Sequence, residues 1–234
     1  TGAVSAQEPD NTLCGYGQGR EVDENNCPVG AMMFNEQFGS YSAYDVTDGD
    51  KICLTFDQGY ENGFTAPILD TLKEKNVKAV FFLTGDYAKR NKELVQRMIN
   101  EGHIIGNHGM KHASLPKLSD EEAREEIMSL HDYVKETYGY EMKYFRPPCG
   151  EYSEKALAHV QSCGYKTLVW SFAYCDWNVN DQPDRVQSLE RVSGAAHKGA
   201  IYLLHSVSET NCQILPEVID NIRAAGFEFG LPEV

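Results

Sequence analysis

Short apolar runs that resemble β-strands alternate with helical patterns from Lys51 to the end of the chain. The runs are Ile52–Phe56, Ala79–Leu83, His103–Asn107, Tyr144–Arg146, Thr167–Ser171, Ile201–His205 and Phe227–Phe229. Strands that alternate with helices form parallel sheets. About seven β/α units are too few for an eightfold barrel, which typically takes about 250 residues. We therefore predict an α/β fold with a distorted, incomplete (β/α) barrel of about seven parallel strands, in preference to an open doubly wound sheet.

The helical patterns between these runs have recognisable ends. They are predicted near Ala66–Lys75, Lys92–Glu101, Asp120–Tyr138, Glu154–Ser162, Asp184–Ala195 and Gln213–Ala224. Ser119 can cap the third helix, with Glu122 returning the hydrogen bond. Gly164 and Gly226 follow helix ends, as left-handed caps require. Residues 1–50 are rich in Gly, Asn, Asp and Tyr and have little periodicity, so we predict an irregular N-terminal arm on a single domain of residues 51–234.

The charge of the chain narrows the classes of partner. Lys and Arg number 21 against 35 Asp and Glu, and the net charge of −14 would repel nucleic acid and anionic bilayers. No run of 18 apolar residues occurs, so we predict no membrane span, and we expect a monomer. The first residues show no signal-peptide pattern, which carries no conclusion for a processed chain.

The seven cysteines are too few for a disulfide-built scaffold. Cys14 and Cys27 bracket a Gly- and Asn-rich stretch and are candidates for one pair. Cys53, Cys163 and Cys175 lie in or beside apolar patterns, where a buried free thiol is expected. No C-x-x-C motif is present, which argues against zinc bound by cysteines, and no glycine-rich nucleotide-binding motif occurs.

Polar or ionisable residues follow five of the apolar runs. They are Asp57 with Gln58, His108 with His112, Arg146, Asp176 with Trp177, and His205. Active sites of parallel barrels lie at the carboxyl ends of the strands, so we expect these side chains to meet in one pocket. A carboxylate, two imidazoles on a metal ion, an arginine and a further histidine are the equipment of a metal-assisted hydrolase.

The first two of these segments each allow two interpretations. His108 and His112 form H-x-x-x-H, which would place two imidazoles on one side of a helical turn, able to share a divalent ion. Such a pair is more often structural, and catalytic zinc normally takes three protein ligands. Asp57 is either a metal ligand or general base, or an ordinary turn or N-cap carboxylate.

The other three segments are equally ambiguous when each is taken alone. Arg146, stiffened by two following prolines, is suited to clamp a carboxylate or to form a structural salt bridge. Asp176 can fix the tautomer of an imidazole, and Trp177 is either a flat wall for a sugar or a core residue. His205 is a general acid or a satisfied core histidine. The occurrence of all five at strand ends favours the functional interpretation.

The order of these motifs resembles the polysaccharide deacetylase domain of carbohydrate esterase family four. The family motifs T-F-D-D, H-x-x-x-H, R-P-P-x-G, Asp-Trp and L-x-H correspond to Thr55–Gln58, His108–His112, Arg146–Gly150, Asp176–Trp177 and Leu203–His205. The resemblance covers about residues 50–234. The segments TFDQGYENGFT, AYCDWNV and LLHSVSETN are similar to the delta-lactam-biosynthetic de-N-acetylases, which act on peptidoglycan N-acetylmuramic acid bare of peptide. The resemblance implies an enzyme that removes N-acetyl groups from cell-wall glycan, outside the cell or in its envelope, with any signal or anchor already removed.

The resemblance also implies a role for each motif residue. Asp57 would be the general base, oriented by Arg146. His205, supported by Asp176, would protonate the leaving amine. Four further residues would contact the substrate, Cys149 through its backbone N–H: Tyr60, Cys149, Trp177 and Leu203.

One position departs from the family pattern at the implied metal site. His108 and His112 would bind a divalent ion, expected to be zinc, but Gln58 stands where the family's second acidic residue supplies the third ligand. A neutral amide is a poorer zinc ligand than a carboxylate, so Gln58 is a doubtful ligand and metal binding is expected to be weak. The similar branch tends to carry an amide here, which argues against simple loss of activity.

Two alternatives to the peptidoglycan substrate stay open. The same pocket could deacetylate chitin oligomers or acetylated xylan, because the acetyl group is shared and specificity lies in the loops. It could also belong to a sugar-binding module whose hydrolysis is lost, an interpretation that only Gln58 supports.

Overall fold

Seven parallel strands form the main sheet in the computed structural model, which describes residues 7–234. In spatial order they are β2 (Ala43–Tyr44), β8 (Lys166–Leu168), β6 (Tyr144–Phe145), β5 (Ile104–Asn107), β4 (Val80–Leu83), β3 (Cys53–Gln58) and β9 (Ile201–His205). A small antiparallel pair joins β1 (Cys14–Gly15) to β7 (Glu151–Tyr152). All pairings in the main sheet are parallel, as the β/α alternation predicts.

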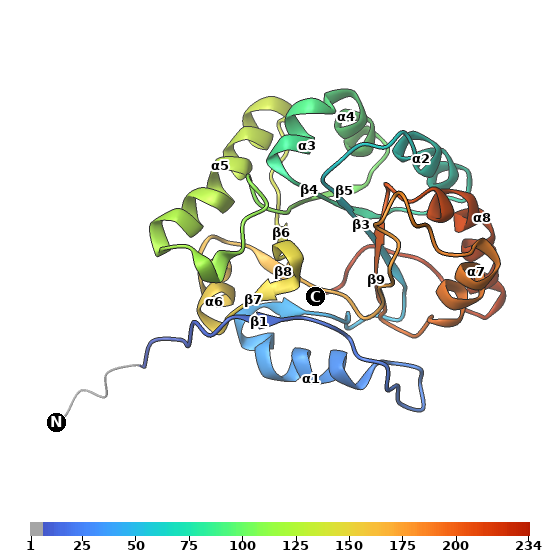
Figure 1. The fold of residues 1–234 in the computed structure, drawn as a ribbon, viewed down its shortest axis with the longest axis horizontal. Coiled ribbons are helices and arrows are strands. Elements are labelled where there is room, and N and C mark those ends of the chain that lie inside the picture. The colour runs from blue at the N-terminus through green and yellow to red at the C-terminus, as the bar shows by residue number, and fades with distance from the viewer. Residues whose placement is uncertain (1–6) are drawn as a thin grey trace.

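Helices surround the sheet in a ring (Figure 1). The outer arc consists of α2 (Thr65–Glu74), α3 (Gly85–Arg90), α4 (Lys92–Asn100), α5 (Asp120–Tyr138), α6 (Glu154–Ser162), α7 (Arg185–Gly194) and α8 (Glu209–Ala224). The capping box of Ser119 and Glu122 at the start of α5 is confirmed. Gly164 and Gly226, with φ of 86° and 93°, follow α6 and α8 in the left-handed conformation, also as expected.

The sheet curls until its two ends nearly meet. Just past β8, the N–H of Ser171 donates to Ile201 in β9 at 2.9 Å, and Leu203 donates to the carbonyl of Phe172 at 2.8 Å. Past β2, Thr47 donates to Gly199 at 2.8 Å. These few bonds make a seam in place of an eighth strand, so the predicted distorted, incomplete barrel is confirmed.

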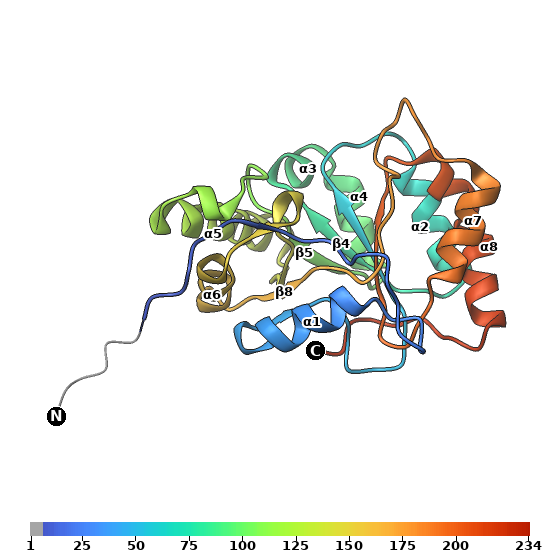
Figure 2. The same cartoon turned by 60° about the horizontal axis from the view of Figure 1, so that its bottom comes forward.

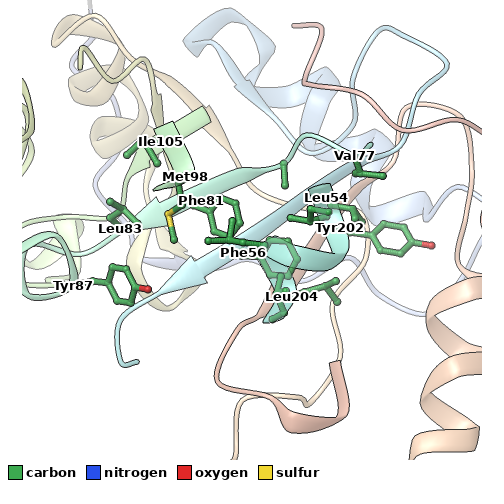
Figure 3. Close-up of a cluster of buried hydrophobic side chains, with 14 of the residues drawn as sticks. Leu54, Phe56, Val77, Phe81, Leu83, Tyr87, Met98, Ile105, Tyr202 and Leu204 are labelled. Atoms are coloured by element: carbon green, nitrogen blue, oxygen red, sulfur yellow. The ribbon is translucent and has the colours of Figure 1, made fainter. Parts of the chain in front are cut away.

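The two-residue period of the strands divides the core into two parts. Figure 3 shows the outer part, between sheet and helices, where Leu54, Phe56, Phe81, Leu83, Tyr202 and Leu204 are buried. The alternate residues fill the inside of the barrel: Cys53, Val80, Phe82, Ile201 and Leu203. Continuing this alternation to the carboxyl ends of the strands puts Asp57 and His205 on the inner face.

The structure differs from the expectation of a wholly irregular segment before residue 51. That segment contains α1 (Val29–Phe38) and β2, the edge strand of the main sheet. Phe34 and Phe38, one helical turn apart, anchor α1 against the inner core. In Figure 2, α1 lies beneath β8 and close to the C-terminus. The division at residue 50 stays a prediction.

One further local prediction is wrong, and one short helix was not predicted. Phe227–Phe229 does not form a strand, because only Phe229 makes a single bridge to Ile52. The short helix α3 was not predicted, since its six residues carry too little periodicity.

Among residues 7–234 there is no helix with the length and apolar character that a bilayer crossing needs.

All seven cysteines lie within the described residues and are free thiols, so the candidate pair Cys14–Cys27 is not formed. Cys53 is buried, as expected for a strand residue that faces the barrel interior. Cys163 is only half-buried and Cys175 is exposed, so the expectation of burial is wrong for both. Each comes after an apolar element has ended, where the pattern no longer constrains burial.

Candidate active site

A buried arginine and a carboxylate form the floor of a groove at the carboxyl ends of the strands. Arg146 Nη1 donates to Asp57 Oδ1 at 3.1 Å and to Thr55 Oγ1 at 2.6 Å. Its other nitrogens donate to the carbonyls of Leu168 and Val169 at 2.9 and 2.8 Å. Burial favours the neutral form of Asp57, but the positive charges of the neighbouring side chains, Arg146 among them, outweigh it and hold the pKa of Asp57 below its ordinary value. Asp57 is therefore an oriented, ionised carboxylate.

Two imidazoles lie beside this carboxylate. The Nε2 atoms of His108 and His112 are 3.1 Å apart, and His108 Nε2 is 3.5 Å from Asp57 Oδ2. The other ring nitrogen of His108 lies 2.7 Å from the carbonyl oxygen of Arg146, which fixes Nδ1 as the donor and leaves the Nε2 lone pair directed at the groove. Burial lowers the pKa of His108 to about 4, so the ring is neutral, as a metal ligand must be.

The histidine pair does not lie on a helical turn, contrary to the sequence prediction. Both residues follow β5 in a loop, and His112 has a φ of 55°, in the left-handed region that non-glycine residues rarely occupy. The two rings lie with their centroids 4.7 Å apart and their planes at 68°. The two rings therefore meet because of the conformation of this loop, and not because of helical periodicity.

The donor set fits a divalent ion held by two histidines. The two imidazoles bring their Nε2 atoms together, and the hydrogen bond to the Arg146 carbonyl supports His108, as is usual for metal-ligating histidines. Within residues 7–234, however, no three His, Cys, Asp or Glu side chains are grouped as a complete metal site. Two imidazoles alone leave the other positions of such an ion open to further ligands.

Gln58, the doubtful third ligand, does not face the two imidazoles. As the residue after Asp57 in β3 it points to the outer, helix-covered face of the sheet. Its amide donates to Thr65 Oγ1 at 3.2 Å and its carbonyl oxygen accepts a hydrogen bond from Ser206. Gln58 is 1% exposed and lines neither of the cavities around the two imidazoles.

His205 faces the same groove from β9 and is held by a buried carboxylate. Asp176 Oδ1 lies 2.8 Å from His205 Nδ1, and Asp176 Oδ2 accepts the backbone N–H of His205 at 2.8 Å. Asn211 also donates to Asp176, at 2.7 Å. Burial alone would lower the pKa of His205, but the hydrogen bond and charge of Asp176, with the charge of Asp57, raise it above the ordinary value. The surroundings of His205 therefore favour its protonated form.

Two cavities flank this centre and share Asp57, His108, His112 and His205. One, of about 630 Å³, is walled by apolar and aromatic residues that include Leu203, Trp177 and the backbone turn at Cys149. The other, of about 460 Å³, has a more polar lining that includes Tyr60, Thr84, Asp86 and Lys111. Trp177 is 58% exposed, which excludes its interpretation as a core residue.

The structure brings together all the residues that the sequence singled out except Gln58, and it adds others. Trp170 and Tyr174 line the aromatic cavity, and Thr55 supports Arg146. Thr55 could have been found from the two-residue period, since it precedes Asp57 by two positions in the same strand. No signal in the sequence marks Trp170, which falls inside an ordinary apolar run.

A parallel, incomplete barrel whose groove combines a carboxylate–arginine pair, two imidazoles and an aspartate-supported histidine defines a hydrolase of the α/β-barrel class. Residues 45–168 match the polysaccharide deacetylase family, and the chain belongs to that family. It is thus a carbohydrate deacetylase by membership as well as by the arrangement of its groove.

Similar proteins match over nearly the whole chain. The chain is 36% identical over 231 residues to the peptidoglycan-N-acetylmuramic acid deacetylase PdaA of Bacillus subtilis, covering 97% of this chain and 88% of that protein. The solved structure of PdaA, a family 4 carbohydrate esterase, superposes with a TM-score of 0.89 over 95% of this chain and 96% of PdaA. A family 4 carbohydrate esterase from Bacillus anthracis gives 0.79 at 36% identity, with 96% of each chain covered. An uncharacterised 30.6 kDa protein of Geobacillus stearothermophilus is 41% identical over 90% of this chain and 81% of its own length.

Proposed function

We propose that this enzyme removes the N-acetyl group of N-acetylmuramic acid in peptidoglycan, acting in the cell envelope or outside the cell with zinc as the divalent ion. We assign hydrolysis because one groove contains two polar pairs, Asp57 with Arg146 and Asp176 with His205. The assignment of substrate rests on the nearly full-length similarity to PdaA. Imidazole ligands suit zinc among the common divalent ions.

Asp57 is the general base in this proposal. Its carboxylate is ionised, and Arg146 fixes its direction toward the groove that His108 also faces. A zinc ion held by His108 and His112 would polarise the acetyl carbonyl and lower the pKa of a bound water. Asp57 takes the proton of the attacking water, a role that typically contributes about 10²- to 10⁴-fold in rate.

His205 is the general acid. An amine cannot leave as an anion, so the nitrogen of the sugar must be protonated when the carbon–nitrogen bond breaks. The raised pKa of His205 favours its protonated form, and Asp176 holds the ring through Nδ1, which leaves Nε2 for the groove. Acid and base thus come from adjacent strands, since Asp57 and His205 are register partners in β3 and β9.

The turn at Cys149 supplies the proposed oxyanion donor. Cys149 has a φ of 59° and Gly150 a φ of 65°, so two consecutive left-handed residues shape the backbone at the wall of the aromatic cavity. Backbone N–H groups in such a concave turn attract anions. Leu203 offers an apolar contact for the acetyl methyl group, and Trp177 and Tyr60 offer rings to the sugar on the two sides of the centre.

The test is acetate release from three purified substrates: peptidoglycan glycan strands without peptide, chitin oligomers and acetylated xylan. Each is assayed with added Zn²⁺ and with chelator, and Asp57→Ala is the inactive control. We expect release from the peptide-free strands, dependent on Zn²⁺. Release only from chitin or xylan would overturn the substrate assignment. Glycan binding without release from any substrate would show a sugar-binding module instead.

A further inference from the structure

Glu126 in α5 is a buried carboxylate that touches the histidine loop and has no part in the proposed reaction. It is 5% exposed, although it belongs to a helix rich in exposed acidic residues. Its two oxygens point to the backbone of residues 109–113, the loop that carries His112. Burying a carboxylate is costly unless hydrogen bonds compensate it, so its contacts there reveal what it stabilises.

The two carboxylate oxygens of Glu126 accept hydrogen bonds from the loop backbone on either side of His112. Glu126 Oε1 accepts the N–H of Lys111 at 2.8 Å, and Oε2 accepts the N–H of Ala113 at 2.7 Å. The carbonyl of Glu126 accepts a third N–H, from Met110, at 3.0 Å. One residue therefore satisfies three of the backbone donors in this loop.

The loop needs such support because its backbone is strained at His112. A φ of 55° at a non-glycine residue persists only where the surroundings determine it strongly. The His112 side chain itself is exposed, so packing does not hold its ring in place. Gly109, with a φ of 85°, leaves room for the carboxylate, since an added Cβ would lie 2.9 Å from Glu126 Oε2.

We infer that Glu126 is a positioning residue for the metal centre, which holds His112 in its left-handed conformation so that its Nε2 meets that of His108. The inference rests on the proposed two-histidine site. With only two protein ligands, the ion depends on both imidazoles being in place before it binds. Groups that orient metal ligands typically contribute about 10- to 100-fold in metal affinity.

The test measures Zn²⁺ affinity of the metal-free full chain by competition with a chromogenic chelator, without any glycan. Glu126→Gln keeps the shape but turns an NH₂ group toward one backbone donor, and Glu126→Asp keeps both oxygens but withdraws them by one methylene. The control is Glu125→Gln, an exposed neighbour in the same helix with the same change in charge. We expect Zn²⁺ binding at least about tenfold weaker in Glu126→Gln than in the control, and intermediate in Glu126→Asp.

A second measurement separates positioning from general stability. The melting temperature of each variant is compared with and without Zn²⁺, because a ligand that binds the folded state raises it according to its affinity. We expect the Zn²⁺-induced rise to shrink in the Glu126 variants and to persist in Glu125→Gln. A lower melting temperature with unchanged Zn²⁺ affinity would overturn the inference and leave the proposed function intact. Absence of Zn²⁺ binding by the unmodified chain would overturn the metal centre itself. If Glu126→Gln does not fold, Glu126→Asp decides the question.

Discussion

At the scale of single residues, the site depends on which charges are buried together. Asp57 stays ionised because Arg146 is fixed beneath it by bonds to two carbonyls and a hydroxyl. His108 stays neutral because it is buried and its Nδ1 proton is committed to a carbonyl. His205 is raised in pKa by Asp176. The same groove thus lowers the pKa of Asp57 and His108 and raises that of His205.

Replacing Asp57 by Asn tests the role of the base. The amide keeps the shape of the side chain but cannot take a proton from water, so kcat for acetate release is expected to fall about 10²- to 10⁴-fold. Zn²⁺ affinity, measured in parallel, is expected to change much less. A variant that retains most of its kcat would contradict the assignment.

The pH dependence of kcat tests the role of the acid. His205 acts while protonated, so kcat is expected to decline as the pH rises through its raised pKa. In Asp176→Asn the supporting charge is gone and burial, which lowers the pKa, dominates. The alkaline limb of the profile should therefore move to lower pH. An unmoved limb would show that another group donates the proton.

At the scale of elements, strand register decides which residues share the groove. Asp57, Arg146 and His205 could be predicted from the sequence, because each lies at or just past the carboxyl end of a strand and parallel strands end at one edge of the sheet. That Gln58 points away from the groove follows from the two-residue period of β3, whereas the family motif made it a doubtful metal ligand. The loop geometry at His112 and Cys149 could not be predicted, since both adopt left-handed backbone angles without being glycine. α1 was missed because its surroundings are rich in residues typical of turns.

Arg146, which directly follows β6, joins β3 to β8, and its removal tests that connection. Its nitrogens contact residues of β3, β8 and the segment after β8, and the side chain is fully buried. Arg146→Met would leave the Asp57 carboxylate buried without its partner, so we expect a loss of about 3–5 kcal/mol in the free energy of unfolding. Chemical denaturation gives the value, and the exposed Arg90→Met, which breaks a surface pair with Asp86, serves as the control. An equally small loss in both variants would refute the argument.

At the scale of the whole molecule, the N-terminal segment contacts the wall of the groove through Tyr16, whose hydroxyl also meets the buried side chain of Asp45. The Tyr16 hydroxyl lies 3.0 Å from Asp45 Oδ2 and also donates to the carbonyl of Trp170, which lines the aromatic cavity. A phenol has one proton for these two acceptors, and Asp45 Oδ1 has no hydrogen-bond partner. Burial raises the pKa of Asp45 to about 8. The neutral acid therefore fits this environment better than the carboxylate.

Asp45 makes the stability of the whole chain depend on pH. Between about pH 4 and pH 8 the folded protein retains this proton while the unfolded chain releases it. The contribution of Asp45 to the free energy of unfolding thus decreases as pH rises across that range, by at most about 1.4 kcal/mol per pH unit, and is lost above pH 8. Unfolding curves at a series of pH values are expected to show a shallower decline in Asp45→Asn than in the exposed control Asp48→Asn. If the free energy of unfolding declines with pH equally in both variants, Asp45 is not protonated in the folded protein.

The two cavities on either side of the catalytic centre bear on how a polymer is processed. Since there is room for neighbouring sugars in both directions, a long strand can lie across the enzyme without offering an end. We therefore expect interior units of a strand to be accessible to the enzyme, and a single sugar to be a poorer substrate because it fills the space on one side only.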